Sequence, residues 1–371
     1  MRLRVASRTE LAREAGLSQP TVGRIVDEMI AESILTVGKG EAASPDSENG
    51  NGTAQLGRPS TPLELDRKRR RFVVVQVGVN QTRMAALPMR VSDADEWEVS
   101  FITPTSPEAF ANAVQQQWKR VAARSVQAVV VSLPGVVDEG KGRVLYSPNL
   151  HWTERADFAQ ICRPMTRATV ICVQEIRALA LGQLAAEPAS DDFLLVDFGS
   201  GVGAAAVIRG KLYDSPLPLS GELGHTPIPG NDRVCSCGAT GCIETLVSRN
   251  GMLVTSRQHS GPRDWTALVS QVHRRGLPDW LVPSLDAVAT TIAGGLNLLG
   301  LRQAILTGAL TEMPAASEYL CTAVSRAAMW SRFGQVRCRV VPRRRMAGMV
   351  TLAINSALLG DVEPAAARER S

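Results

Sequence analysis

Four side chains of metal-ligating type lie close together in the second half of the chain. His225 is followed by three cysteines at positions 235, 237 and 242. Three thiolates and one imidazole form a Cys₃His set, the closed tetrahedral arrangement typical of structural zinc. Gly238 and Gly241 would let the loop turn tightly around the ion. The spacing predicts a structural zinc site, because no ligand position remains open for the water of a catalytic zinc.

The alternative for this cluster is a set of buried cysteines without a metal. Seven cysteines are an odd number, and the crowding of three in one short loop favours metal binding over disulfides in a cytosolic chain. The other four cysteines stand in apolar or mixed contexts, where we expect core packing: Cys162, Cys172, Cys321 and Cys338.

The first forty residues predict two short helices joined by a turn. Ser7 and Glu10 fit a capping box, and Gly16 can close the first helix in a left-handed conformation. Ser18 then caps a second helix, whose apolar stripe is Val22, Ile25, Val26, Met29 and Ile30. Leu11, Ala12 and Ala15 form the expected inner face of the first helix. Small and apolar residues at these positions are typical of a helix-turn-helix.

Polar side chains at the start of the second helix could contact DNA. Those expected to face outward are Ser18, Gln19, Thr21 and Arg24, which can read base edges or hold phosphates in the major groove. A plain helical hairpin is the alternative. Winged domains of this kind usually carry a further helix before this pair, and the sequence begins close to Ser7.

The segment after the two helices predicts a long wing or loop. Residues 38–62 are rich in Gly, Ser, Asn and Pro and poor in large apolar residues. Arg58, within Gly-Arg-Pro, could enter the minor groove or belong to a structural turn. The basic run at 67–71 is either a solvated linker or a phosphate contact, and it marks a domain boundary.

From Phe72 onward the pattern becomes α/β. Apolar strands with glycines near their ends are predicted in FVVVQVGV, AVVVSLPGVVD, TVICVQ, FLLVDFGSGVGAAAVI and AILTGAL. Helices are predicted between several of them, at 107–122, 176–184 and 285–299, with Ser106 as a cap and Pro107 in the first turn. This organisation predicts a ligand-binding α/β domain behind the N-terminal helices.

Bulk composition agrees with a multidomain globular protein of 371 residues, with 44% hydrophobic and 21% charged residues. The net charge of +5 permits nucleic-acid binding without demonstrating it. We find no apolar run of the roughly 20 residues that a membrane span needs, and no signal-peptide pattern at the start. A cytoplasmic location is therefore expected.

The chain resembles the ROK family (repressors, open reading frames and kinases), especially its transcriptional repressors. The resemblance covers nearly the whole sequence, through SRTELAREAGLSQPTV, GRPSTPLELD, SLPGVVD, SPNLHW, DFGSGVGAA and the highly specific GELGH…CSCGATGCIE. It implies an actin-like (ribonuclease H-like) fold of two lobes with a ligand cleft between them, in a homodimer or homotetramer. The expected division is a winged helix-turn-helix at 1–66, lobes at 67–185 and 186–362, and a tail at 363–371.

The resemblance also implies roles for individual residues. His225, Cys235, Cys237 and Cys242 match the zinc ligands. Sugar hydroxyls would be held by Glu222, His225 and Glu244, with Gly135 and Asn149 near the sugar. Carboxylates accept hydrogen bonds from hydroxyls, and a metal on one imidazole nitrogen leaves the other free to face the sugar.

Two departures from the family's kinases predict an inactive enzyme. Gln76 stands where the kinases carry an aspartate that works with phosphates and metal. Glu175, after Gln174, replaces the aspartate that serves as general base, and it is one methylene longer. A misplacement of about 1 Å can cost about 100-fold in rate. The Gly-rich stretch at 199–203 is weak evidence for a phosphate loop.

These observations favour a transcriptional regulator, most simply a repressor, that senses a sugar or amino-sugar, with Glu175 among the sugar contacts. Two recognition helices in a dimer predict an operator with inverted half-sites on double-stranded DNA. Two alternatives remain open. The chain could be an active sugar kinase, or a regulator that has lost sugar sensing and responds to a protein partner.

Overall fold

The computed structural model describes residues 6–38, 61–90, 95–121, 125–188, 190, 192–215 and 219–359. The chain divides into two compact units, which meet between Arg70 and Arg71. Arg58, most of the predicted wing and the predicted tail lie outside the described residues.

The first unit contains two helices and a two-stranded antiparallel ribbon. The helices are α1 (Arg8–Ala15) and α2 (Gln19–Ala31), and the strands are β1 (Leu35–Val37) and β2 (Leu63–Leu65). The capping box of Ser7 with Glu10 is present, and Gly16 closes α1 with a φ of 64°. Ser18 caps α2 through the N–H of Thr21. Local signals therefore placed both helix boundaries correctly.

Two residues predicted to be inside this unit are exposed. The small core contains Ala12, Val22, Val26 and Leu63, whereas Ala15 is exposed and Ile25 keeps 36% of its surface accessible. Those two predictions were wrong, because α1 buries only Ala12 and is too short to cover the flank of α2 that carries Ile25.

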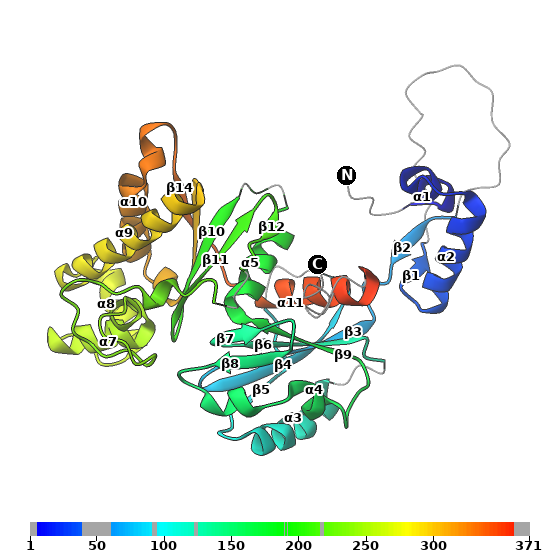
Figure 1. Cartoon of the computed structure of the whole chain (residues 1–371), viewed down its shortest axis with the longest axis horizontal. Helices are drawn as coiled ribbons and strands as arrows, with labels where there is room; N and C mark the ends of the chain where they lie inside the picture. The colour runs from blue at the N-terminus through cyan, green and yellow to red at the C-terminus, as the bar shows by residue number, and fades with distance from the viewer. Residues whose placement is uncertain are drawn as a thin grey trace, which may run out of the picture. The chain divides into compact units, whose positions relative to one another are not determined.

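The second unit begins with a five-stranded sheet in the order β5-β4-β3-β6-β9. Its strands are β3 (Arg70–Val77), β4 (Gln81–Pro88), β5 (Val99–Ile102), β6 (Ala128–Leu133) and β9 (Thr169–Gln174). β3, β6 and β9 are parallel. A hairpin of β7 (Val136–Asp138) and β8 (Arg143–Tyr146) follows β6. One face of the sheet is covered by α3 (Pro107–Val121), α4 (Phe158–Cys162) and the 3₁₀ turn η1 (His151–Arg155), as Figure 1 shows.

A second five-stranded sheet, in the order β12-β11-β10-β13-β14, follows in the chain. Its strands are β10 (Phe193–Phe198), β11 (Val202–Ile208), β12 (Lys211–Leu212), β13 (Gln303–Gly308) and β14 (Arg337–Val340). One face packs against α7 (Arg249–Gln258), α8 (Trp265–Arg275), α9 (Val282–Leu299) and α10 (Pro314–Ala327). Short turns complete this half: η2 (Leu223–His225), α6 (Glu244–Val247), η3 (Asp279–Leu281), η4 (Ala309–Glu312) and η5 (Met329–Arg332).

Two helices join the halves of the second unit. α5 (Glu175–Ala186) leaves the first sheet and packs its Ile176, Leu179 and Ala180 against the second. α11 (Arg345–Ile354), which continues as a π-helix at Asn355–Leu359, follows the second sheet and packs on α5 and β6. Where α5 and α11 cross, a Cβ on Gly182 would lie 1.9 Å from the Arg344 carbonyl oxygen, and one on Gly348 would lie 1.8 Å from that of Ala178. The two backbones therefore touch directly.

Among the described residues, the helical segment Asp279–Leu299 is long and apolar enough to cross a membrane by length and composition. Asp286 lies within this segment, so it is not an uninterrupted apolar run of the length considered in the sequence. Of the window tested, 44% is buried within the protein, and its buried residues belong to the core under the second sheet.

Candidate functional site

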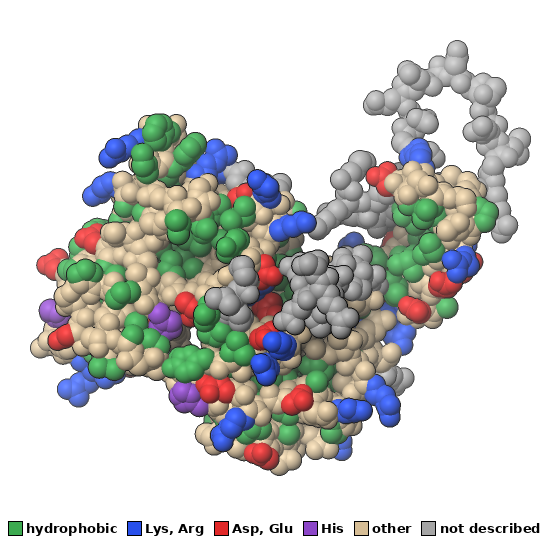
Figure 2. All heavy atoms as spheres, viewed as in Figure 1, with side chains coloured by type: hydrophobic (Ala, Val, Ile, Leu, Met, Phe, Trp, Pro, Cys, Tyr) green, Lys and Arg blue, Asp and Glu red, His purple; other side chains and the backbone are tan. Residues whose placement is uncertain are grey.

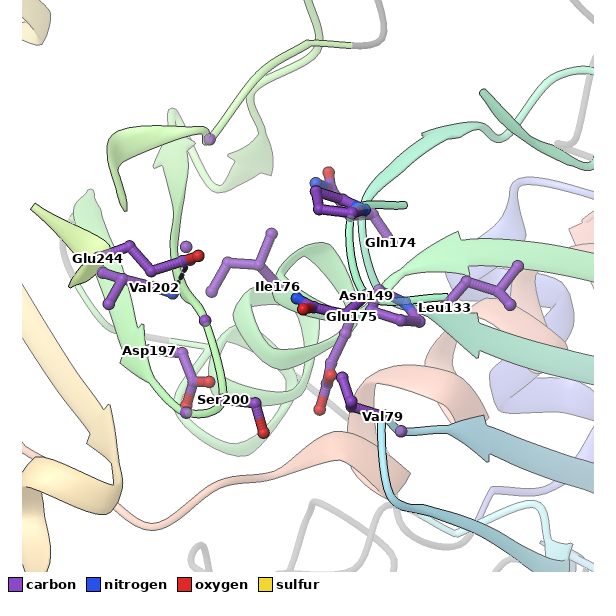
Figure 3. A pocket seen from close by; sticks show the side chains of 18 of the residues that line it. Val79, Leu133, Asn149, Gln174, Glu175, Ile176, Asp197, Ser200, Val202 and Glu244 are labelled. Carbon is purple, nitrogen blue, oxygen red and sulfur yellow. Dashed lines mark hydrogen bonds between the residues drawn. The ribbon is translucent and has the colours of Figure 1, made fainter. Parts of the chain in front are cut away.

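A cavity of about 220 Å³ lies between the two halves of the second unit. Its walls come from the carboxyl ends of β3, β6 and β9, from the loop after β10, and from the segment before α11. Ligands of open α/β sheets characteristically bind at the carboxyl ends of parallel strands. Figure 3 shows Asn149, Gln174 and Glu175 on one side of the cavity, facing Asp197 and Glu244 on the other.

All six residues predicted to contact a sugar line this cavity. They are Gly135, Asn149, Glu175, Glu222, His225 and Glu244. Gly135 has a φ of 87°, and a Cβ there would lie 2.3 Å from the Tyr146 carbonyl oxygen, so the loop after β6 needs glycine. The long-range assembly brings together residues from segments more than a hundred positions apart in the sequence.

Glu222 occupies a polar corner of the cavity. Gln174 Nε2 donates a hydrogen bond of 3.0 Å to Glu222 Oε1, and His225 Nε2 lies 3.6 Å from Glu222 Oε2. Burial raises the pKa of the Glu222 carboxyl, and the nearby Glu244 adds to that effect. Glu222 lines the cavity, and each carboxyl oxygen has a second lone pair that can accept a hydrogen bond from a ligand.

Glu244 supports the glycine-rich loop after β10. Its Oε2 accepts a hydrogen bond of 2.8 Å from the Val202 N–H, the dashed line in Figure 3. A Cβ on Gly201 would lie 2.7 Å from the same oxygen, so the loop packs closely on this carboxylate. Glu244 thus has one oxygen committed to the protein backbone.

Glu175 is held by the protein itself. Its Oε1 accepts hydrogen bonds from Arg345 Nε at 2.6 Å and from Gln76 Nε2 at 3.2 Å. Burial alone would raise the pKa of Glu175, but the positive charges of Arg345 and Arg343 and these hydrogen bonds lower it below its ordinary value. The residue lines the cavity as predicted, yet at least one of its oxygens is already occupied.

A second buried ion pair lies beside the first. Arg343 forks onto Asp197, with Nε and Nη2 at 2.6 and 2.9 Å from the two carboxylate oxygens, and also donates to the Phe198 carbonyl at 3.1 Å. Burial would lower the pKa of Arg343, but Asp197 and Glu175 raise it above its ordinary value. Burial raises the pKa of the Asp197 carboxyl above its ordinary value, and the charge and bidentate hydrogen bonds of Arg343 oppose that effect.

The sequence analysis missed Asp197, Arg343 and Arg345. A signal for the arginines was present in the sequence, since three consecutive arginines at positions 343–345 lead into an apolar helix. Cations at a helix N-terminus oppose the helix dipole, so such a cluster calls for carboxylate partners. The identity of those partners could not be read locally, because they lie 146 and 170 positions away in the sequence.

The predicted metal ligands form one cluster. The ligand atoms of His225, Cys235, Cys237 and Cys242 all lie within 4.8 Å of one another. Cys235 Sγ is 3.6 Å from His225 Nδ1, and the sulfurs of Cys237 and Cys242 are 3.7 Å apart. For Zn–S of about 2.3 Å and Zn–N of about 2.05 Å, tetrahedral angles require about 3.6 Å and about 3.8 Å. These two separations therefore fit a tetrahedral ion, and the other donor atoms lie within 4.8 Å.

Backbone geometry holds this cluster in place. Gly238 and Gly241 adopt φ values of 89° and 91°, as the predicted tight loop requires. His225 turns Nδ1 toward the sulfurs and Nε2 toward Glu222. One imidazole thus joins the cysteine loop to the cavity. Cys162 and Cys172 are buried, and Cys321 and Cys338 are partly buried against the core, as predicted.

Apart from Arg58, which lies outside the described residues, the residues predicted to contact DNA lie at the start of α2, and several have partners within the protein. The hydroxyls of Ser18 and Thr21 are 2.8 Å apart. Arg24 pairs with Glu28 at 3.3 Å, with both side chains mostly exposed. Gln19 is exposed. Gln19 and Arg24 are therefore the long polar side chains that are exposed on the predicted recognition surface.

Comparison with known proteins places the second unit in a family. The ROK family model matches residues 72–353. A putative xylose repressor of Caldicellulosiruptor sp. (strain Rt8B.4) is 26% identical over 264 residues, which cover 67% of this chain and 62% of that protein. A glucokinase of Halalkalibacterium halodurans is 27% identical over 192 residues, covering 49% and 57%.

Two solved structures show the same fold. A ROK family transcriptional regulator described as a homologue of the E. coli MLC protein has a TM-score of 0.71 at 19% identity, covering 95% of this chain and 93% of its own. A ROK family glucokinase from Streptomyces griseus, with glucose and AMPPNP, has a TM-score of 0.60 at 20% identity, covering 76% and 97%. The family model spans more than half of the chain, and the chain belongs to the ROK family.

Proposed function

We propose that this protein is a DNA-binding transcriptional repressor whose ROK domain senses a sugar or amino-sugar. The observation that carries the proposal is the cavity, which gathers Glu222, Glu244, His225 and Asn149 in a space of about 220 Å³. Pockets for drug-sized ligands span roughly 300–1,000 Å³, so this one suits a smaller molecule such as a monosaccharide. Carboxylate and imidazole groups recognise neighbouring hydroxyls. The xylose repressors among the relatives support the same reading.

DNA binding is assigned to residues 1–66, and sensing to lobes at 67–185 and 186–362. In the first unit, α1 and α2 meet at Gly16, and the ribbon of β1 and β2 forms the base of a wing. The described residues of this unit contain seven basic and seven acidic side chains. DNA recognition therefore depends on the local placement of Gln19 and Arg24 rather than on overall charge.

Zinc is assigned to the Cys₃His cluster as a structural ion. The match between the measured separations and a tetrahedral set supports this assignment. The ion would hold His225 with Nε2 toward the cavity, since Nδ1 faces the sulfurs. The metal would then stabilise the sugar-binding wall without entering any reaction.

Two features of the cavity argue against kinase activity. The side that adjoins Gln76 and the glycine loop contains the Arg343–Asp197 and Arg345–Glu175 pairs, in the region where nucleotide phosphates would have to approach. A carboxylate whose pKa is lowered is a poor general base, which applies to Glu175. A coupled assay for ADP formation with hexoses, pentoses and amino-sugars is expected to show no turnover. Turnover that Glu175→Gln abolishes would establish a kinase.

A sugar can alter DNA affinity only if it prefers one arrangement of the lobes over another. The cavity meets this requirement, because its ligand would contact both halves of the second unit at once. A homodimer or homotetramer would present paired recognition helices to an operator with inverted half-sites, roughly 34 Å apart.

The sugar proposal is tested by thermal shift and calorimetry with a panel of pentoses, hexoses and amino-sugars. At least one sugar should raise the melting temperature, and Glu222→Gln should weaken its binding by about tenfold or more. Glu187→Gln is the matched control, because Glu187 pairs with Arg339 away from the cavity. If no sugar stabilises the protein, the regulator answers to another signal, such as a protein partner.

The DNA proposal is tested on a duplex selected from a random library by the full-length protein. Arg24→Ala should weaken binding by about 1–3 kcal/mol in fluorescence anisotropy. Arg13→Ala is the control, because Arg13 is an exposed arginine in the last turn of α1. Equal effects of the two substitutions would contradict the placement of the recognition surface on α2.

A further inference from the structure

An exposed group of large apolar side chains lies at the end of α9 and in and after η5, on the side of the second sheet that its helices cover. It consists of Leu298 at the end of α9, Met329 and Trp330 in η5, and Phe333, which we call the apolar knob. Their exposed fractions are 86%, 55%, 43% and 70%. None of the four lines the cavity. Soluble proteins rarely expose such contiguous patches without a binding role.

Hydrogen bonds fix the backbone that carries the knob. The Met329 N–H donates to Asn297 Oδ1 at 2.8 Å, which joins the end of α9 to η5. The N–H groups of Phe333 and Gly334 both donate to the Trp330 carbonyl, at 2.9 and 3.0 Å. The ring centroids of Trp330 and Phe333 are 6.2 Å apart. Beneath them Ala328 and Val324 are buried in the core. A backbone fixed in this way loses little conformational entropy on binding.

The chain segments that carry the knob are rich in arginine. Residues 296–303 and 324–340 contain five arginines and no aspartate or glutamate. Arg339 is paired with Glu187, whereas Arg326 and Arg332 are exposed beside the knob. Figure 2 shows hydrophobic side chains with Lys and Arg on either side at the upper end of this region. Trp, Phe, Met and Arg are the residue types enriched at protein interfaces, where acidic side chains are depleted.

We propose that the apolar knob docks a second protein through a face that combines large apolar residues with carboxylates. Complementary charge selects the partner, because Arg326 and Arg332 would meet carboxylates across the contact. A second copy of this chain, related by a two-fold axis through the knob, would instead bring the arginines of both copies into one contact without carboxylates to meet them. Nucleic acid is disfavoured, because Leu298, the most exposed member, is aliphatic and offers no ring for a base to stack on.

The test uses the full-length protein and two fluorescent helical peptides of about five turns. Both carry the same Leu and Phe face, and their polar faces are all Glu in one and all Lys in the other. The Glu peptide should bind at least about tenfold more tightly. Phe333→Ser and Arg332→Glu should each weaken its binding by about tenfold. Ile102→Ser is the matched control, since Ile102 is 82% exposed on β5, and should leave binding unchanged.

Three outcomes would overturn the proposal. The first is equal binding of the two peptides, or binding that Phe333→Ser does not affect. The second is that a fluorescent single-stranded oligonucleotide binds the protein, that Phe333→Ser abolishes this binding, and that the Glu peptide does not bind. The third is sedimentation showing that Phe333→Ser dissociates an oligomer of this chain, which would make the knob a self-association surface. Because the four side chains are exposed, melting temperatures of the variants should match wild type, and none of these readouts depends on sugar or operator binding.

Discussion

The buried pair of Arg345 and Glu175 yields a quantitative prediction. The side chains of Arg345 and Glu175 are only 10% and 23% exposed, and Arg345 Nε lies 2.6 Å from Glu175 Oε1. Removing one partner of a buried pair typically costs about 3–5 kcal/mol, because the remaining charge is uncompensated. Glu175 would keep its hydrogen bond from Gln76 and the positive charge of Arg343. We therefore expect Arg345→Met to destabilise the protein by about 3 kcal/mol.

The assay is thermal and urea unfolding of the full chain. A loss of this size corresponds to a fall in melting temperature of roughly 6–12 °C. Arg339→Met is the matched control, because the Arg339–Glu187 pair has both side chains 36% exposed and should contribute about 0–1 kcal/mol. The double variant Arg345→Met/Glu175→Gln should recover the part of the loss that comes from Glu175, whereas Asp95, which lies 3.8 Å from Arg345 Nη1, still lacks that positive charge.

The same prediction has a pH signature. In the wild type the pKa of Glu175 is lowered, so its contribution to stability is present above its unfolded pKa and is lost as the pH falls through its folded value. In Arg345→Met, burial would raise that pKa, and the carboxyl would be stable when protonated. The gap between wild type and variant should therefore shrink from about pH 8 to about pH 5. A loss no larger than that of Arg339→Met, or a double variant no better than the single one, would refute the reasoning.

Two further predictions concern the metal cluster and the helix crossing. Mass spectrometry of the purified protein should find a single zinc ion per chain. The variant Cys237→Ser should lose this ion, whereas the control Cys321→Ser should retain it. Zinc bound to Cys237→Ser would contradict the Cys₃His assignment. Burial and the neighbouring thiols raise the pKa of Cys242 to about 12 in the metal-free cluster, so metal uptake must release protons and weaken as the pH falls. Gly182→Ala should destabilise the protein by about 1–3 kcal/mol through its clash with the Arg344 carbonyl. The control is Gly294→Ala, because nothing lies within 4 Å of its new methyl group. This substitution should stabilise α9 by about 0.5–1 kcal/mol in unfolding experiments. If Gly182→Ala and Gly294→Ala changed stability equally, the backbone contact at Gly182 would be contradicted.

Local signals in the sequence predicted much of the fold. Ser7, Gly16 and Ser18 mark helix boundaries because capping depends on residues only a few positions apart. The apolar runs from Phe72 to Leu310 predicted strands that the structure contains. The more polar strand β4 and the helix α11 were not predicted.

The chemistry of the cavity was predictable only in part. Glu222, His225 and Glu244 stand within short, specific motifs. Arg343 pairs with Asp197, and Arg345 pairs with Glu175. These pairs could not be predicted from the sequence, because tertiary contacts and not periodicity bring the partners together. Ile25 was wrongly predicted to be buried. An apolar stripe shows which side of a helix is apolar, but it does not show how much of that side another element covers.

The glycine crossing of α5 and α11 has a consequence for how the lobes can move. A contact between two main chains has no side chains that could adopt new rotamers, so the helices cannot slide along one another without separating. We therefore expect this crossing to act as a pivot when the lobes move relative to one another. Distances between labels near Gly182 and Gly348 should stay constant when a ligand binds, while those between the outer edges of the two sheets should change most.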